Sequence, residues 1–233
     1  MKQIAKSARF VLLVQSLAYF GLGFVSIFPA YGASEKFDSA DDHLIPVEYR
    51  FDQSYQALVS SRLFVGRANL RIVTLPSHAT EGETVVALCS HCQETAETRV
   101  TVTRAERSLW SAKFGQDPKF THGPAPKVRR CDAAIPNSLA EVIFKAVKKM
   151  VDETRALRNR ENVVVLDSTD TVFSIEGSDG RRSQGLLTPY AAGKNGAAMR
   201  RLTDFLMKYC ESQPSLRPPF LKKIKTEAHN LTP

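Results

Sequence analysis

The chain has 233 residues, with 32 Lys and Arg against 24 Asp and Glu, which gives a net charge of +8. If Lys2, Lys6 and Arg9 are removed with an N-terminal export signal, 29 basic residues remain against 24 acidic ones, a net charge of +5. This mild excess is too small to indicate a nucleic-acid-binding protein. It favours a protein or an anionic component of the cell envelope as partner.

Residues 1 to 33 are typical of an export signal. Basic residues precede an apolar run at 10 to 28, and small residues follow it. Ala30 and Gly32 suit a cleavage site, so we expect cleavage after Gly32 or Ala33. The alternative is an uncleaved anchor, because the apolar run just reaches the length that spans a bilayer. Membrane attachment is expected only through this segment.

Residues 34 to 43 are polar and aperiodic, and are expected to form a flexible lead-in. Residues 44 to 114 are predicted to form a mainly β half that ends in a helix. Thr103 and Glu106 have capping-box spacing, which predicts that the helix follows the last strand directly and ends near Gly115. Strands are expected at residues 44–51, 63–75, 83–88 and 98–103.

Residues 115 to 136 are rich in Pro and Gly and are predicted to form an exposed connector between two halves. Residues 137 to 212 form the second half. Ser138 and Glu141 have the spacing of another capping box, which predicts the start of a long amphipathic helix. The apolar face of that helix is expected to comprise Leu139, Val142, Ile143, Ala146, Val147, Met150, Val151 and Leu157.

Three further strands are expected at 162–168, 171–177 and 183–188, joined by turns into an antiparallel meander. A last helix is predicted from Asn195 or Gly196. Its apolar face is expected to comprise Met199, Leu202, Phe205, Leu206, Tyr209 and Cys210.

The tail, residues 213 to 233, is basic and rich in Pro, and is expected to be mobile. Docking through Phe220, Leu221 and Ile224 is the alternative. The fold class is therefore α+β, with short antiparallel strands and about three helices. Its C-terminal half is predicted to be a helix, a three-stranded antiparallel meander and a second helix.

Four cysteines, Cys89, Cys92, Cys131 and Cys210, are the candidate site residues. In an exported protein an even number of cysteines favours structural disulfides. The preferred pairing is Cys89 with Cys92 and Cys131 with Cys210, because the first two are only three positions apart and the others flank the second half.

Two other interpretations of the cysteines remain open. The spacing Cys89-x-x-Cys92, with His91 inside it, resembles the active-site tetrapeptide of thioredoxin-like oxidoreductases. The apolar residues before it and the β alternation after it differ from the helical context of such sites. Ligands for a metal site would be the cysteines together with His91 and His122, but a second closely spaced pair is missing.

The sequence contains no G-x-S-x-G elbow, H-E-x-x-H helix, P-loop or dinucleotide-binding glycine pattern. Catalytic residues, cofactors and a metal are therefore not predicted. We expect an exported, periplasmic or secreted, non-enzymatic interaction protein, such as an inhibitor or an envelope-binding module. A thiol-disulfide redox protein and a metal-binding envelope protein are the alternatives.

Overall fold

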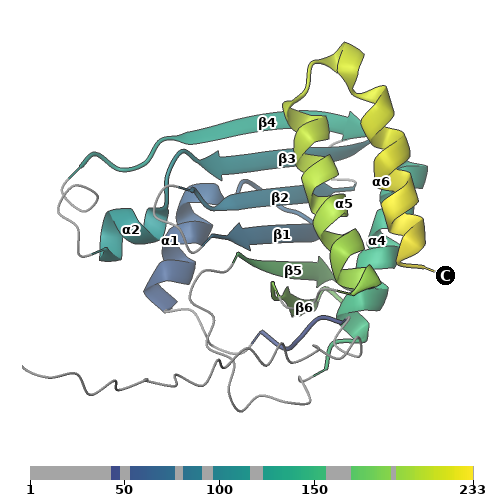
Figure 1. Cartoon of the computed structure of the whole chain (residues 1–233), viewed down its shortest axis with the longest axis horizontal. Coiled ribbons are helices and arrows are strands. Elements are labelled where there is room, and N and C mark those ends of the chain that lie inside the picture. The colour runs from purple at the N-terminus through teal and green to yellow at the C-terminus, as the bar shows by residue number, and fades with distance from the viewer. Residues whose placement is uncertain are drawn as a thin grey trace, which may run out of the picture. The chain divides into compact units, whose positions relative to one another are not determined.

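Six antiparallel strands form one sheet, with helices on both faces (Figure 1). This computed structural model describes residues 43–47, 53–76, 81–90, 97–115, 123–155, 169–189 and 193–232, all within the unit Phe37–Pro233. The strand order is β4-β3-β2-β1-β5-β6. The α+β fold class is confirmed. The strands are β1 (Leu70–Leu75), β2 (Thr84–Cys89), β3 (Thr98–Ala105), β4 (Val128–Ile135), β5 (Asp170–Glu176) and β6 (Arg182–Leu187).

Three long helices cover one face of the sheet: α4 (Asn137–Asp152), α5 (Lys194–Glu211) and α6 (Pro218–Asn230). Every second residue of the strands points to this face, so side chains such as Val100 and Phe173 are buried against the helices. Each large apolar side chain buried in this way contributes about 1.5 to 3 kcal/mol. We call this layer the helix-covered face.

Two shorter helices, α1 (Gln53–Leu63) and α2 (Leu109–Phe114), pack on the opposite face. Their core is smaller, and it comprises Tyr55, Val59, Leu63, Val73, Leu75, Val85, Ala105 and Leu109. We call this layer the short-helix face. The sequence did not predict α1, which buries only Tyr55, Val59 and Leu63 among its 11 residues.

Long periodic segments were predicted well. The alternation over residues 98 to 103 lies in β3, where Val100 and Val102 are buried on the helix-covered face. The helices expected after residue 137 and near residue 195 are α4 and α5, and most of their predicted apolar residues are buried. Two of the three expected meander strands correspond to β5 and β6, which form a hairpin.

Both capping boxes were wrong. Thr103 is inside β3, paired with Val85 on one side and Arg130 on the other, so its backbone groups belong to the sheet. The helix starts later, and the hydroxyl of Ser108 accepts a hydrogen bond from the Ser111 backbone N–H at 3.2 Å. Helix α4 begins after Pro136 without a side-chain cap.

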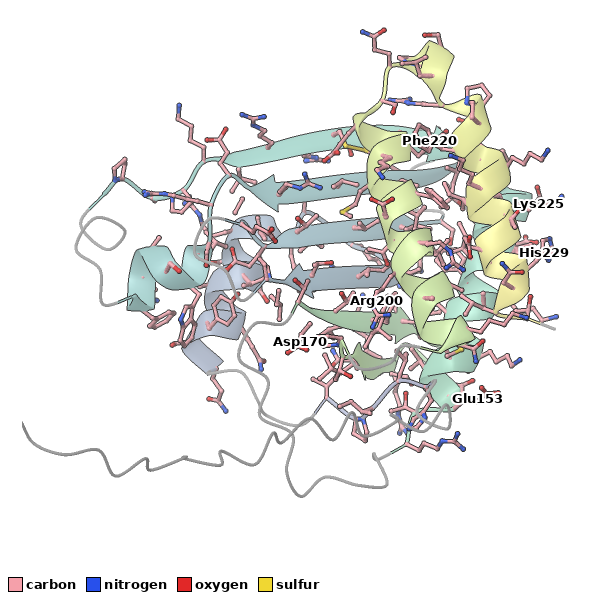
Figure 2. All side chains as sticks on the ribbon, viewed as in Figure 1. Glu153, Asp170, Arg200, Phe220, Lys225 and His229 are labelled. Carbon is pink, nitrogen blue, oxygen red and sulfur yellow. A yellow bond between two sulfur atoms is a disulfide. The ribbon has the colours of Figure 1, made fainter. Side chains whose placement is uncertain are left out.

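The connector and the tail were also wrong in part. Residues 128–135 of the predicted connector form β4, because pairing with β3 satisfies their backbone groups. The two predicted halves share one sheet, since β1 pairs with β5. The tail contains α6, in which Ile224 and Ala228 are fully buried, while Lys225 and His229 point outward (Figure 2). Two prolines at its first positions suit a helix start.

Several predictions lie outside the described residues. They are the export signal, nearly all of the lead-in and the strand at 162–168. Of the strand expected at 44–51, the structure describes residues up to Val47, where Ile45 forms an isolated bridge with Leu186. Among the helices of the described ranges, none has the length and apolarity required to cross a bilayer.

Candidate functional site

The structure contains the predicted disulfide between Cys131 on β4 and Cys210 on α5. The two Cα atoms are 5.9 Å apart, within the usual range for a disulfide. The bond closes a sequence separation of 79 residues and ties the outermost strand to the helix that covers it. Cys210 is buried in the core, and Cys131 is partly buried against it.

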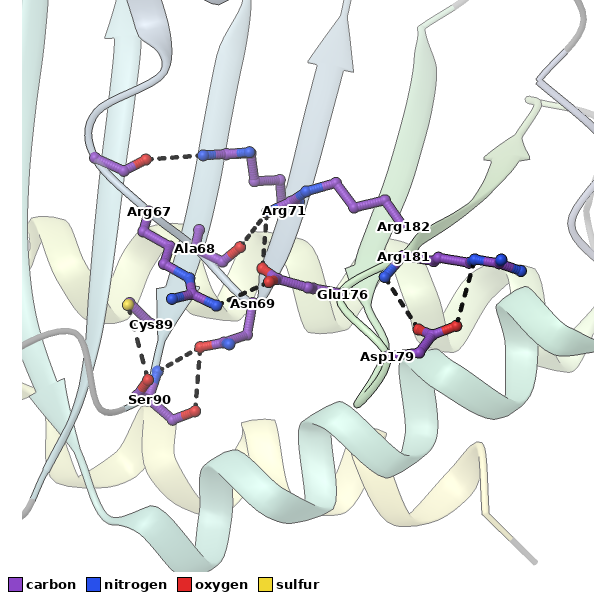
Figure 3. Close-up of polar contacts among 11 residues, drawn as sticks. Arg67, Ala68, Asn69, Arg71, Cys89, Ser90, Glu176, Asp179, Arg181 and Arg182 are labelled. Atoms are coloured by element: carbon purple, nitrogen blue, oxygen red, sulfur yellow. Dashed lines mark hydrogen bonds and ion pairs between the residues drawn. The ribbon is translucent and has the colours of Figure 1, made fainter.

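Cys89 is also disulfide-bonded, and it is the last residue of β2 with 7% of its surface exposed. Cys92 and His91 lie outside the described residues. The residue that follows Cys89 is anchored to Asn69, the residue just before β1. The backbone N–H and the hydroxyl of Ser90 both donate to Oδ1 of Asn69, at 2.9 and 3.1 Å (Figure 3).

Arginines gather at this end of β1, β5 and β6 (Figure 3). Arg67 donates to one carboxylate oxygen of Glu176 at 3.0 Å, and Arg182 donates to the other at 3.2 Å. Arg182 also donates to the carbonyl oxygen of Ala68. Arg71 lies nearby and feels the charge of both Arg182 and Glu176, so three guanidinium groups share one carboxylate and positive charge is in excess.

Strand pairing positions these groups. Residues directly opposite each other in an antiparallel pair point to the same face. Arg71 of β1 is opposite Ser174 of β5, and Ser174 is opposite Gln184 of β6. The row therefore faces α1 on the short-helix face. Residues 71 and 182 are far apart in sequence, and only the adjacency of β1, β5 and β6 brings them together.

A pocket of about 200 Å³ lies between α1 and this row. Val59, Phe64, Val73 and Val172 supply apolar walls, and Arg71 and Arg182 supply positive charge. An apolar cavity with a few converging polar groups is the common form of a small-ligand site. We call this cavity the arginine pocket.

Arg71 is held firmly within the pocket but is not fully satisfied. Its Nη2 donates to the carbonyl oxygen of Gly66 at 2.8 Å, and its guanidinium carbon lies 4.8 Å from the centre of the Phe64 ring. Its Nε is buried and has no hydrogen-bond partner in the described part of the chain. A buried donor without an acceptor costs about 1 to 3 kcal/mol.

The charges around Arg71 also indicate that this side chain lacks an anionic partner. Burial lowers the pKa of its guanidinium, the charge of Arg182 lowers it further, and Glu176 opposes both effects. Arginine stays protonated in spite of such shifts. The positive charge at Arg71 is therefore incompletely compensated, and an anionic group would relieve both the unpaired donor and the repulsion.

A larger cavity of about 810 Å³ lies where α5 covers the ends of β3 and β4, but its arginines already have carboxylate partners. Arg129 contacts Glu106 at 2.8 Å, and Arg104 contacts Glu211 at 3.4 Å. In the arginine pocket Arg182 is likewise paired with Glu176, but Arg71 has no carboxylate partner among the described residues and its Nε is unpaired, so this smaller pocket is the better candidate for an anion.

A second polar cluster on the short-helix face is structural. Glu83 is fully buried, and its carboxylate accepts hydrogen bonds from Tyr55 at 2.7 Å, from the backbone N–H of Leu109 at 2.7 Å and from that of Trp110 at 3.1 Å. Burial and the neighbouring Glu83 raise the pKa of the Tyr55 hydroxyl well above its usual value. This network joins α1 and α2 to the sheet.

No group of three or more metal-ligating side chains occurs within the described ranges. Sequence reasoning missed Arg71, Arg182 and Glu83, since none of them belongs to a motif. A charged residue inside the apolar run LRIVTL was the available signal for Arg71. Comparison of the chain with protein families, with curated proteins and with solved structures finds no match.

Proposed function

We propose that this protein is a non-enzymatic binding protein that acts outside the cytoplasm and recognises an anionic partner through the arginine pocket. The observation that carries the proposal is the buried Nε of Arg71, which lacks an acceptor. The partner presents a carboxylate, or a comparable anionic group, on a small apolar body. A free envelope component and the side chain of a bound protein both offer that chemistry.

Three features support this assignment. Arg71 and Arg182 provide two guanidinium groups, and Arg is the side chain best suited to planar anions. The pocket walls are apolar, so a charge-assisted hydrogen bond there is stronger than in water. The excess of basic residues across the chain attracts anions over a longer range.

The test is a titration of the full chain with small organic anions, followed by isothermal calorimetry and by NMR. Benzoate and hexanoate are the probes, and benzamide and hexanamide are the uncharged matches. We expect the anions to bind and the amides to bind at least about tenfold more weakly, because a charge-assisted hydrogen bond contributes about 1.5 to 3 kcal/mol.

Two variants locate the binding. Arg71→Gln should weaken anion binding at least about tenfold. Arg181→Gln is the matched control, because its side chain is 89% exposed and pairs with Asp179 on the hairpin turn, outside the pocket lining. Anion binding that is equal in the wild type and in Arg71→Gln, or no anion binding at all, would contradict the proposal.

Thiol chemistry at Cys89 and Cys92 is the alternative function, and labelling after mild reduction tests it. A readily reduced bond with a thiolate that reacts below neutral pH would favour the redox protein. A bond that resists mild reductant would favour the binding protein. Elemental analysis of the purified chain tests the metal-binding alternative.

A further inference from the structure

Strand β4 is the outermost strand on one side of the sheet, and only β3 pairs with it. The opposite edge is partly covered, because the backbone of Ile45 exchanges hydrogen bonds of 2.9 and 2.7 Å with Leu186 of β6. No described residue covers β4 in the same way. An uncovered edge strand presents free backbone donors and acceptors that can pair with another chain.

The hydrogen-bond pattern identifies which residues of β4 point outward. The backbone N–H of Glu106 donates to the carbonyl of Lys127 at 2.9 Å, so Lys127 points to β3. Backbone N–H and C=O groups point alternately to the two sides of an antiparallel strand. The N–H and C=O groups of residues 128, 130, 132 and 134 therefore point away from β3, toward the open edge. Tyr209 supports this assignment, because its hydroxyl donates from α5 to the outward carbonyl of Ala134 and so already occupies one acceptor near the end of the edge. The outward backbone groups of residues 130 and 132, nearer the centre of the strand, have no such contact among the described residues.

The outer edge is long enough and regular enough to pair. Strand β4 has eight residues, and its register with β3 runs unbroken from Ile135 to Val128. It contains no proline, and no bulge interrupts it, so two common devices that block edge pairing are missing. Arg130 and Asp132 carry opposite charges at two successive outward positions.

We propose that a second copy of this chain pairs with β4 in antiparallel orientation, so that the two sheets become continuous across a two-fold axis beside Cys131. Arg130 of each copy is then opposite Asp132 of the other, and Val128 is opposite Ala134. Each Arg130–Asp132 pair exchanges both of its backbone hydrogen bonds and brings unlike charges together.

Charge selects this register over its neighbours. A shift of two residues places Arg130 opposite Arg130, or Asp132 opposite Asp132, which is unfavourable. A shift of one residue brings outward groups opposite inward ones and breaks the ladder. The strand is thus self-complementary in one register, and this favours a second copy over an unrelated acidic segment.

Contacts within each copy hold the side chains of Arg130 and Asp132 in place and keep Asp132 charged. Nε of Arg130 lies 3.0 Å from Asp132, and the hydroxyl of Thr101 donates to Asp132 at 2.6 Å. Burial raises the pKa of Asp132, but the hydrogen bonds from Thr101 and Arg130 and the charges of Arg130 and Arg99 outweigh it, so the net shift is downward. Asp132 is therefore ionised at neutral pH.

An exposed apolar side chain lies in a segment that projects past this edge. The connection between α5 and α6 contains a short helix, η1 (Pro214–Leu216), and it extends beyond β4 (Figure 1). Leu216 in this segment is 59% exposed. A two-fold axis normal to the sheet places the helices of both copies on the same face, and brings this connection toward the other copy.

The test is sedimentation equilibrium of the full chain from roughly 1 µM to roughly 1 mM, together with light scattering. We expect a reversible monomer–dimer equilibrium. Arg130→Asp and Asp132→Arg should each shift the dissociation constant upward by at least about tenfold, because like charges become opposite. The double variant exchanges the two charges and should restore the dimer.

Arg129→Asp is the matched control. It makes the same charge change on the same strand, but residue 129 is opposite Ala133 in the proposed register and its ion pair with Glu106 is exposed. This variant should dimerise like the wild type. Thermal unfolding of every variant shows whether a loss of dimer reflects a loss of fold.

A second variant addresses the backbone. The N–H of Arg130 points outward, so Arg130→Pro keeps the ladder to β3 and blocks edge pairing. We expect a folded monomer. The inference is overturned if the wild-type chain stays monomeric throughout, if the single charge variants dimerise unchanged, or if the double variant stays monomeric. A wild-type monomer that binds an acidic extended peptide would identify a different occupant for the edge.

Discussion

The two faces of the sheet differ in the interactions that stabilise the helices packed on them. The helix-covered face is sealed by α4, α5 and α6, by a large apolar cluster and by a disulfide. The short-helix face has a smaller apolar core, a fully buried glutamate and a pocket lined by two arginines. One face therefore supplies most of the apolar burial, which leaves the other able to carry buried charge and a cavity.

The largest expected change in the free energy of unfolding comes from removing the disulfide between Cys131 and Cys210 on the helix-covered face. Replacing both with Ala removes a cross-link over a separation of 79 residues, and the chain-entropy model gives a loss of about 4 kcal/mol in the free energy of unfolding. Urea unfolding followed by circular dichroism measures it.

The double replacement Cys89→Ala and Cys92→Ala is the comparison, and it should cost much less because the predicted loop is short. Equal losses in the two double variants would show that the long cross-link does not constrain the unfolded chain in the expected way.

The next effect concerns the short-helix face. Glu83→Gln should cost about 2 kcal/mol, because the amide nitrogen of Gln cannot accept from Tyr55, Leu109 or Trp110, and a buried donor is left unpaired. Trp110 is the single tryptophan of the chain, and its ring centre lies 5.1 Å from that of Tyr55. Its fluorescence therefore reports on this face.

Glu106→Gln provides the control for Glu83→Gln, since Glu106 pairs with the 81% exposed side chain of Arg129. It should cost less than about 1 kcal/mol. If both variants gave the same loss, the buried network would have no special role in anchoring α1 and α2.

The smallest effect is expected where α6 meets α5. Arg201 forms two hydrogen bonds with Glu227, at 2.8 and 2.9 Å, and these lower the pKa of Glu227 although burial opposes them. Glu227→Gln should cost about 1 kcal/mol at neutral pH, because half of the Arg201 side chain is exposed.

The effect of Glu227→Gln should depend on pH. A carboxylate with a depressed folded-state pKa stabilises the protein above its unfolded-state pKa, and this stability is lost as pH falls through the folded-state value. The difference between wild type and variant should therefore shrink as the solution is acidified. Asp204→Asn, in an exposed pair with Lys208, should show a smaller difference throughout.

The sequence predicted the elements in which the spacing of apolar residues within a single segment shows which side is buried. The alternation in β3 and the three-and-four spacing in α4 each bury one side of a single element, so the pattern appears within a few residues. Helix α1 and strand β4 lack such patterns. Each depends on a neighbouring strand or helix that only the folded chain supplies.

The candidate site divides in the same way. The pairing of Cys131 with Cys210 was predicted, because an even number of cysteines and the expected export favour disulfides and leave few pairings. The arginine pocket was not predicted, because arginine is common on surfaces and Arg71 and Arg182 are 111 positions apart in the sequence. Only the pairing of β1 with β5, and of β5 with β6, reveals it.

Strand β1 lies inside the sheet, yet one of its two neighbours comes much later in the chain. Leu70 pairs with Leu88 on one side and with Ile175 on the other. The hairpins β1–β2 and β2–β3 can form early, whereas closing the β1–β5 pair requires a long loop and is slower. Until β5 arrives, one edge of β1 stays open, and the arginine pocket cannot form. This pocket is thus completed late in folding, after most of the chain has been made.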